Sequence, residues 1–202
     1  MALHGDPAAL VWDPCCGSGY LLTVLALLHP RQITTVLGTD IEPAALHLAE
    51  QNLALAGREG LIARAADLDA HAERFDKPSY TAAARRLARG LATGQSDVTH
   101  AVHRADVFDP DQLRRALDGR RPGVMITGVP YGGQTAWHGP DGASGAAGML
   151  RALRVVLPEN AVIAVAVRGH RLRLDDGLRA QTTFRIGTRT VALFRARPAP
   201  AH

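Results

Sequence analysis

Short apolar runs alternate with longer segments of helical periodicity along most of the chain. The first run, residues 9–12, stops at Asp13, and a glycine-rich turn follows at once, which is typical of a buried parallel strand. After that turn the apolar positions fall at helical spacing, including Leu21 and Leu25, until Pro30 ends the helix. A strand, a turn and a helix in this order form the first half of a parallel βαβ unit.

The same alternation continues toward the carboxyl end. A strand at residues 35–39 precedes a helix that begins at Pro43, a residue favoured in the first helical turn. Further strands are predicted at residues 99–103, 123–127 and 161–167, and further helices after Asp109 and around Met149. Residues 183–186 and 190–194 are predicted to pair as a hairpin, because the gap between them is too short for a helical crossover. The pattern predicts an α/β fold, a Rossmann-like doubly wound sheet with an antiparallel hairpin at its carboxyl end.

Two segments interrupt this rhythm. Residues 58–98 are too long for a simple connection and carry Arg85, Arg86 and Arg89 at helical spacing, so we expect an inserted helical element there. Residues 132–148 contain six glycines, and we expect them to be mobile. Neither segment resembles a domain linker, and the length of 202 residues suits one domain over residues 1–202.

Acidic residues follow three of the predicted strands. Asp13, Asp40 and Asp106 each come at a strand end, and Pro130 follows a fourth. The carboxyl ends of parallel strands form one edge of the sheet, where open α/β folds bind ligands. We therefore expect these residues to surround one crevice.

The turn after the first strand has the chemistry of a site for S-adenosylmethionine (SAM). Gly17 and Gly19 let the backbone approach a ligand, and the amino terminus of the next helix offers N–H groups to a carboxylate such as that of SAM. Asp40 follows Gly19 by about 20 residues, as in folds that bind ribose hydroxyls through a carboxylate. The expected cofactor-binding residues are Asp13, Pro14, Cys16, Gly17, Ser18, Gly19, Asp40, Ile41, Asp106 and Val107.

A nicotinamide dehydrogenase is the competing interpretation of this turn. Its fingerprint needs a third glycine three residues after the second, so that helix and strand can pack closely. That position is occupied by Leu22. The turn therefore favours SAM, with Asp13 near the ammonium group and Asp106 near the adenine amine.

Composition adds a modest preference for a polyanionic partner. The net charge is +4 and the pI near 9.7, which suits nucleic acid. Cys15 and Cys16 are adjacent and expected to be free thiols, and the scattered histidines predict no metal site. No apolar run is long enough to span a membrane, and the amino terminus does not resemble a signal peptide. A cytoplasmic location is expected, with a monomer favoured.

Five sequence strings resemble a known enzyme family. They are WDPCCGSGYLLTVL at residues 12–25, RFDKPSY at 74–80, RADVFDP at 104–110, PYG at 130–132 and IGTR at 186–189. Together they resemble the AviRa type of ribosomal RNA methyltransferase, the avilamycin-resistance enzymes. The resemblance implies a seven-stranded SAM-dependent fold, methylation of a guanine in 23S ribosomal RNA, and resistance to an orthosomycin antibiotic. Members of this type carry an additional segment before the first strand, so a truncated or weakened version is one expectation.

The substrate side of the site is predicted partly from this resemblance, at Gly128, and partly from residue type and charge. Gly128, Pro130 and Tyr131 are the expected catalytic residues, with Tyr131 stacking on a flipped or unpaired base. Gly128 stands where the family has Asp or Asn, and loss of a general base costs about 10²- to 10⁴-fold in rate, which predicts a slow enzyme. The expected RNA-binding residues are Arg85, Arg86, Arg89 and Trp137.

Each of these assignments has a structural alternative. The arginines also suit a solvated helix face, and Tyr131 and Trp137 also suit a packed core. Two alternative functions remain open: a catalytically impaired SAM- or RNA-binding module, and a small-molecule methyltransferase.

Overall fold

The computed structural model describes residues 9–92, 98–129, 137, 145–168 and 179–196, except the side chains of residues 86–92. The strands are β1 (Ala9–Asp13), β2 (Ile33–Asp40), β3 (Thr99–Arg104), β4 (Val124–Gly128), β5 (Val162–Arg168), β6 (Thr182–Ile186) and β7 (Arg189–Arg195). The helices are α1 (Tyr20–Leu28), α2 (Pro43–Leu53), α3 (Arg58–Phe75), α4 (Pro78–Ala92), α5 (Pro110–Leu117) and α6 (Gly145–Val156), with a short 3₁₀ turn, η1 (Ala54–Ala56), between α2 and α3.

The strands form one sheet in the order β3-β2-β1-β4-β5-β7-β6. Neighbouring strands from β3 through β5 pair in parallel, whereas β7 pairs antiparallel with both β5 and β6. The predicted seven-stranded sheet with a carboxyl-terminal hairpin is confirmed. The chain builds β2 and β3 on one side of β1 and then crosses to β4 on its other side, so strand order reverses between β1 and β4, where such sheets bind ligands.

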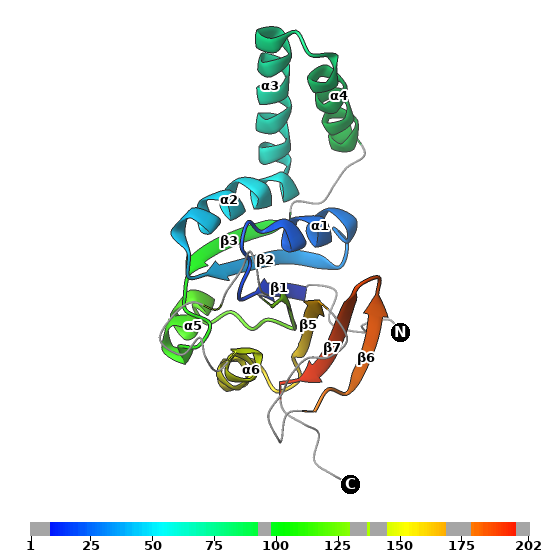
Figure 1. The fold of residues 1–202 in the computed structure, drawn as a ribbon. Coiled ribbons are helices and arrows are strands. Elements are labelled where there is room, and N and C mark those ends of the chain that lie inside the picture. The colour runs from blue at the N-terminus through cyan, green and yellow to red at the C-terminus, as the bar shows by residue number, and fades with distance from the viewer. Residues whose placement is uncertain (1–8, 93–97, 130–136, 138–144, 169–178, 197–202) are drawn as a thin grey trace.

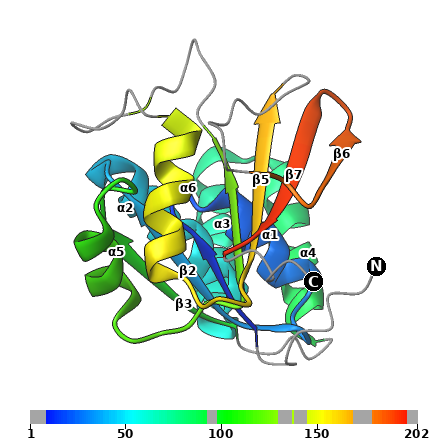
Figure 2. The ribbon, with the colours of Figure 1, turned by 90° about the horizontal axis from the view of Figure 1, so that it is seen from below.

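Helices cover the two faces of this sheet, with α1 and α2 on one face and α5 and α6 on the other (Figures 1 and 2). The core divides accordingly into two clusters. Trp12, Met125 and Leu153 are buried on the α5 and α6 side, and Leu22 and Leu53 are buried on the α1 and α2 side. Side chains of β1, β2, β3 and β4 contribute to both clusters, whereas those of β5 and β7 contribute to the first cluster. This division of side chains between the two faces fixes the register of the central strands.

The expected helical insert consists of α3 and α4, which pack against each other and project from the rest of the molecule (Figure 1). Leu61, Leu68 and Ala84 are buried along the insert. The helix α3 ends at Phe75, and the next residue, Asp76, has a left-handed backbone (φ 46°) that reverses the chain toward α4. At its base, Gly60 lies so close to η1 that an added Cβ would be 1.9 Å from the carbonyl oxygen of Ala54.

The prediction of a mobile segment over residues 132–148 is wrong at its carboxyl end. Residues 145–148 form the first turn of α6, which begins at Gly145 with a positive φ of 54°. Burial of Ala147, Met149 and Leu150 in the core outweighs the low helix propensity of the glycines. Except for Trp137, the rest of that segment lies outside the described residues. None of the helices in the described part of the chain is long and apolar enough to cross a bilayer.

Candidate cofactor and substrate site

The bend between β1 and α1 depends on its two glycines. Gly17 and Gly19 have positive φ angles of 52° and 72°, which L side chains rarely adopt. An added Cβ at Gly19 would be 3.1 Å from Cα of Ala49 in α2, so the bend also rests against that helix. The N–H of Cys16 donates to the carbonyl of Thr39 at 2.9 Å, which joins the bend to β2.

The carboxylate of Asp40 holds this bend from the end of β2. Its Oδ2 accepts a hydrogen bond from the N–H of Gly17 at 2.8 Å, and its Oδ1 accepts one from Glu42 at 3.0 Å. Each oxygen keeps a lone pair for a further donor. Asp40 was expected to bind ribose hydroxyls, and the structure shows that it also positions the glycine turn.

Asp13 lies at the end of β1, only 3% exposed. Its Oδ1 accepts a hydrogen bond from the N–H of Cys15 at 3.1 Å, and burial raises its pKa to about 7. The Thr127 hydroxyl is close enough to lower that pKa, although it has no partner at hydrogen-bonding geometry in the described part of the chain. A buried carboxyl group without a cationic partner among these residues fits an incoming ammonium group.

Asp106 lies in the turn after β3 and is 7% exposed. Its Oδ1 accepts a hydrogen bond from the N–H of Phe108 at 2.9 Å, and its own N–H donates to Oε1 of Gln112 at 3.0 Å. No described residue donates to Oδ2. The carboxylate therefore has an oxygen available for an exocyclic amine, and Val107 beside it is buried and apolar.

Several residues that position this site were not predicted. Asn52 in α2 donates from Nδ2 to the carbonyl of Ser18 at 2.8 Å, Trp12 donates from Nε1 to Thr39 Oγ1 at 3.1 Å, and Gln112 fixes the Asp106 turn. They support the residues expected to meet a ligand. Their signal in the sequence was weak, since Asn52 and Gln112 stand among other polar residues and Trp12 is the last residue of an apolar run.

The end of β4 is open at the expected substrate side. Gly128 is exposed, and an added Cβ would meet no atom of the described residues within 4 Å. Val129, directly after it, is buried. The other two expected catalytic residues, Pro130 and Tyr131, lie outside the described residues.

The expected RNA-binding residues fall in two places. Trp137 packs edge-on against Phe108, with ring centroids 5.4 Å apart, and so lies beside the Asp106 turn. Arg85 is exposed on α4, which projects with the insert. Arg86 and Arg89 belong to the same helix, and their side chains lie outside the described part.

The two cysteines are free and lie next to the glycine bend. Burial raises the pKa of both thiols well above the ordinary value, which keeps them protonated and unreactive. An added Cβ at Gly38 would be 2.9 Å from the Cys16 sulfur, so Cys16 fills space between β2 and the bend. Among the described residues, no group of three or more His, Cys, Asp and Glu side chains could hold a metal ion.

Comparison with known proteins agrees with this geometry. The family model described as rRNA methyltransferase AviRa matches residues 2–189. A curated relative from Streptomyces viridochromogenes, named 23S rRNA (guanine(2535)-N(1))-methyltransferase, is 46% identical over 197 residues, which are 96% of this chain and 78% of the relative. Two solved structures of rRNA methyltransferase aviRa from the same organism share 45% identity at a TM-score of 0.83, covering 96% of this chain and 79% of theirs. The chain belongs to the AviRa family of rRNA methyltransferases.

Proposed function

We propose that this protein transfers a methyl group from SAM to a guanine of 23S ribosomal RNA. The observation that carries the proposal is the hydrogen bond from Gly17 in the glycine bend to Asp40. Asp13 lies directly before the bend, and Asp106 follows β3, the strand beside β2 in the same parallel sheet. The name of the 46% identical relative supports guanine N1 as the acceptor atom. The activity, the cofactor and the target base are inferred together, because methyl transfer requires SAM and the guanine to bind in the same crevice.

Each chemical group of SAM can be assigned to a residue or segment of the crevice. Asp13 faces the ammonium group, the bend over residues 17–19 receives the carboxylate, and Asp40 accepts hydrogen bonds from the ribose hydroxyls. Asp106 takes the adenine amine through Oδ2, with Ile41 and Val107 beside the ring. SAM supplies the electrophilic methyl group, and the protein supplies position and orientation, which can contribute roughly 7 to 11 kcal/mol.

The guanine is proposed to approach at the end of β4. Gly128 leaves open space there, and its carbonyl and that of Val129 can accept hydrogen bonds from the base. Tyr131 would stack on the base, as expected from the sequence, with Pro130 shaping the turn. Trp137 lies next to Phe108 and would border the same space.

Longer-range contacts are proposed to come from the insert. Arg85, Arg86 and Arg89 share α4, and a helix that projects from the body can reach RNA beyond the target nucleotide. Ribosomal RNA as substrate implies a cytoplasmic location. Methylation of the base would protect the ribosome against an orthosomycin antibiotic, as the resemblance implies.

Incubation with radiolabelled SAM and 23S ribosomal RNA tests the proposal. We expect label in 23S and not in 16S RNA, and a reverse-transcription stop at one guanine, because an N1 methyl group blocks Watson–Crick pairing. Deproteinised RNA and intact large subunits should be compared as substrates. Absence of label in both would refute the proposed function, and label in a small metabolite would point to another substrate class.

A further inference from the structure

A second site lies outside the cofactor crevice, between the sheet edge and α5. A cavity of about 360 Å³ is lined by His103, Arg104, Gln112, Arg115 and Ala116. The first two are the last residues of the edge strand β3, and the others belong to α5. His103 and Arg104 precede Asp106 by three and two residues. Gln112 lines the cavity and also accepts the hydrogen bond from the N–H of Asp106, so the cavity adjoins the proposed adenine end of the crevice.

The basic side chains that line this cavity have N–H groups that no described residue accepts. The Nε of Arg104 donates to the carbonyl of Ile41 at 3.1 Å, which holds the guanidinium in place and leaves its terminal nitrogens available. In the described part of the chain, neither Arg115 nor His103 has a hydrogen-bond acceptor. Two guanidinium groups and an imidazole thus line one hollow without a bonded anion.

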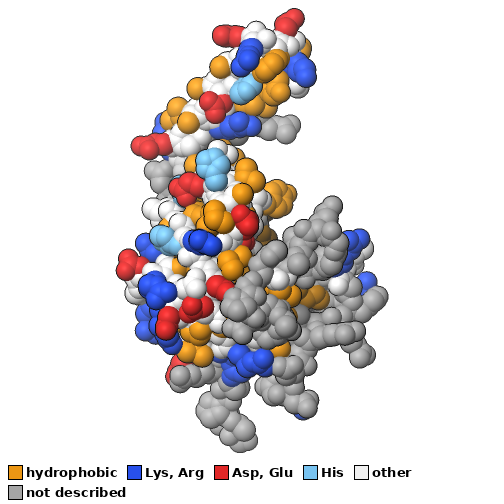
Figure 3. Space-filling view, turned by 60° about the vertical axis from the view of Figure 1, so that its left-hand side comes forward, with side chains coloured by type: hydrophobic (Ala, Val, Ile, Leu, Met, Phe, Trp, Pro, Cys, Tyr) orange, Lys and Arg blue, Asp and Glu red, His pale blue; other side chains and the backbone are white. Residues whose placement is uncertain are grey.

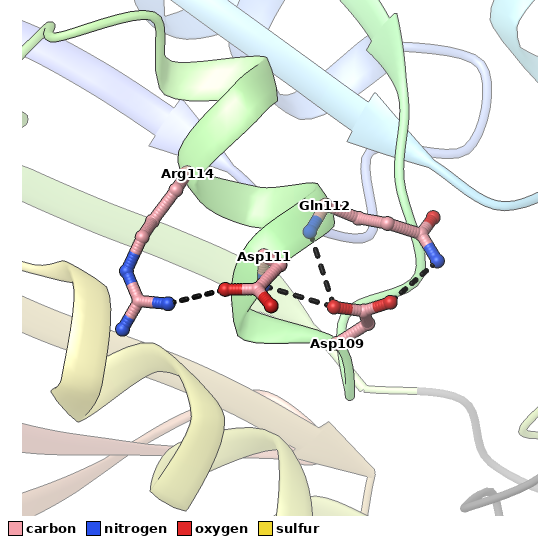
Figure 4. Close-up of polar contacts among 4 residues, drawn as sticks. All are labelled: Asp109, Asp111, Gln112 and Arg114. Atoms are coloured by element: carbon pink, nitrogen blue, oxygen red, sulfur yellow. Dashed lines mark hydrogen bonds and ion pairs between the residues drawn. The ribbon is translucent and has the colours of Figure 1, made fainter.

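Two acidic residues at the start of α5, Asp109 and Asp111, already have hydrogen-bond or ion-pair partners. Asp109 accepts hydrogen bonds from the backbone N–H groups of Asp111 and Gln112 and from Gln112 Nε2, at 2.9, 3.1 and 2.8 Å (Figure 4). Asp111 forms an ion pair with Arg114 at 2.6 Å. The positive charge of Arg115 is the smallest of the effects that lower the pKa of Asp109. Among the described residues, Arg115 forms no ion pair.

The cavity suits a phosphate group, which the proposed RNA substrate supplies. Lys and Arg side chains, with some acidic ones among them, lie on the side of the molecule that Figure 3 brings forward, where α2 and α5 lie. Forked guanidinium donors match phosphate oxygens, and the volume accommodates a phosphate with its neighbouring ribose. SAM contains no phosphate, so cofactor binding does not require these arginines.

We propose that the cavity between β3 and α5 binds a backbone phosphate of the RNA substrate, through Arg115 and Arg104 with His103 as a further donor. This inference rests on the proposed function. A phosphate held here would belong to a nucleotide near the target base, because the cavity adjoins the crevice. It would fix the register of the RNA without reading its sequence.

The test compares Arg115→Gln with Arg114→Gln, a matched control on the same helix whose arginine is already paired with Asp111. Binding of 23S RNA is measured from 50 to 200 mM salt, with SAM affinity measured by calorimetry. We expect Arg115→Gln to weaken RNA binding about tenfold and to reduce the salt slope by about one. Arg115→Lys should recover the slope but only part of the affinity, and all three variants should bind SAM normally.

Equal affinity and salt slope for Arg115→Gln and the parent protein would overturn the inference. Titration with inorganic phosphate identifies the source of the anion. If inorganic phosphate binds the parent protein but not Arg115→Gln, and Arg115→Gln leaves RNA affinity unchanged, the cavity is a site for free phosphate only. That result also overturns the inference. The two proposals fail separately. A parent protein that binds RNA through Arg115 but transfers no methyl group refutes the proposed function alone, and methyl transfer indifferent to Arg115 refutes this inference alone.

Discussion

The N–H of Gly17 donates a 2.8 Å hydrogen bond to Oδ2 of Asp40, so the carboxylate at the end of β2 holds the glycine bend at the end of β1. Asp40 also accepts a hydrogen bond from Glu42, at the start of α2. The bend that we propose binds the cofactor is therefore held by a residue that we also propose binds the ribose hydroxyls. A carboxylate suits this position, because a neutral acceptor would hold the bend less firmly.

Replacement of Asp40 should damage both stability and cofactor binding. We expect Asp40→Ala to lower the free energy of unfolding by about 2 kcal/mol, since two hydrogen bonds to a charged group are lost. SAM affinity should fall at least about tenfold, which corresponds to 1.4 kcal/mol. Asp40→Asn should retain part of both. Urea denaturation and calorimetry measure the effects, with Asp111→Ala as an exposed control that costs less than about 1 kcal/mol; an Asp40→Ala protein with parental SAM affinity would contradict this role.

The strands and the acidic residues at their ends could be predicted from the sequence for a physical reason. Parallel strands buried on both faces are continuous apolar runs, so β1 and β5 were predicted to within about one residue at each end. The parallel pairing of β1, β2 and β3 then places Asp13, Asp40 and Asp106 along one edge of the sheet. Local pattern and general topology were sufficient for this part of the site.

The contacts that hold the site together could not be predicted in the same way. The bonds from Asn52 to Ser18 and from Gln112 to Asp106 depend on how α2 and α5 pack on the sheet, and one sequence does not specify that packing. The start of α6 at Gly145 was missed because glycine indicates a loop locally, whereas burial of Met149 decides the outcome.

The base of the insert depends on the close approach of Gly60 to η1. An added Cβ there would be 1.9 Å from the carbonyl oxygen of Ala54, and a backbone atom cannot swing away. Gly60→Ala should therefore lower the free energy of unfolding by about 2 kcal/mol, although glycine to alanine in a helix ordinarily stabilises by up to about 1 kcal/mol. Urea denaturation and hydrogen exchange along α3 measure the loss.

Gly57→Ser is the control for that substitution. Gly57 precedes α3 with an extended backbone, and its added Cβ would be 3.7 Å from the same oxygen, an ordinary contact. Serine also caps helix starts well, so stability should be unchanged or slightly higher. If Gly60→Ala were as stable as Gly57→Ser, the insert would not be anchored by this contact.

Gly128 tests the substrate side of the crevice. Because an added Cβ meets no atom within 4 Å in the part of the chain that the structure describes, both Gly128→Asn and Gly128→Leu should fold with stability changed by less than about 0.5 kcal/mol. Leucine would occupy the space proposed for the guanine and lower kcat/KM for 23S RNA about 100-fold, with SAM affinity unchanged. Asparagine adds an acceptor for the base and should raise kcat, by up to about 100-fold. Parental kcat/KM in Gly128→Leu would place the base elsewhere.

The pH dependence of stability reports on Asp13. Burial raises its pKa from an ordinary 3.8 to about 7, so between these values the folded protein keeps a proton that the unfolded chain has lost. The contribution of Asp13 to the free energy of unfolding is complete below about pH 4 and is lost as the pH rises through 7. The difference between its two pKa values corresponds to roughly 4 kcal/mol. Asp13→Asn should therefore flatten this part of the stability profile and be more stable than the parent at pH 8.

The same carboxyl group should make SAM binding pH-dependent. An ammonium group beside Asp13 favours the carboxylate, so the bound state releases the proton and the affinity should rise with pH, by about tenfold per unit below pH 7. Calorimetry at pH 5.5, 6.5 and 7.5 measures the trend in the parent and in Asp13→Asn, which should show weaker and nearly pH-independent binding. Because Asp13→Asn removes the titration and keeps the shape, equal pH profiles in the two proteins would mean that the SAM ammonium group binds away from Asp13.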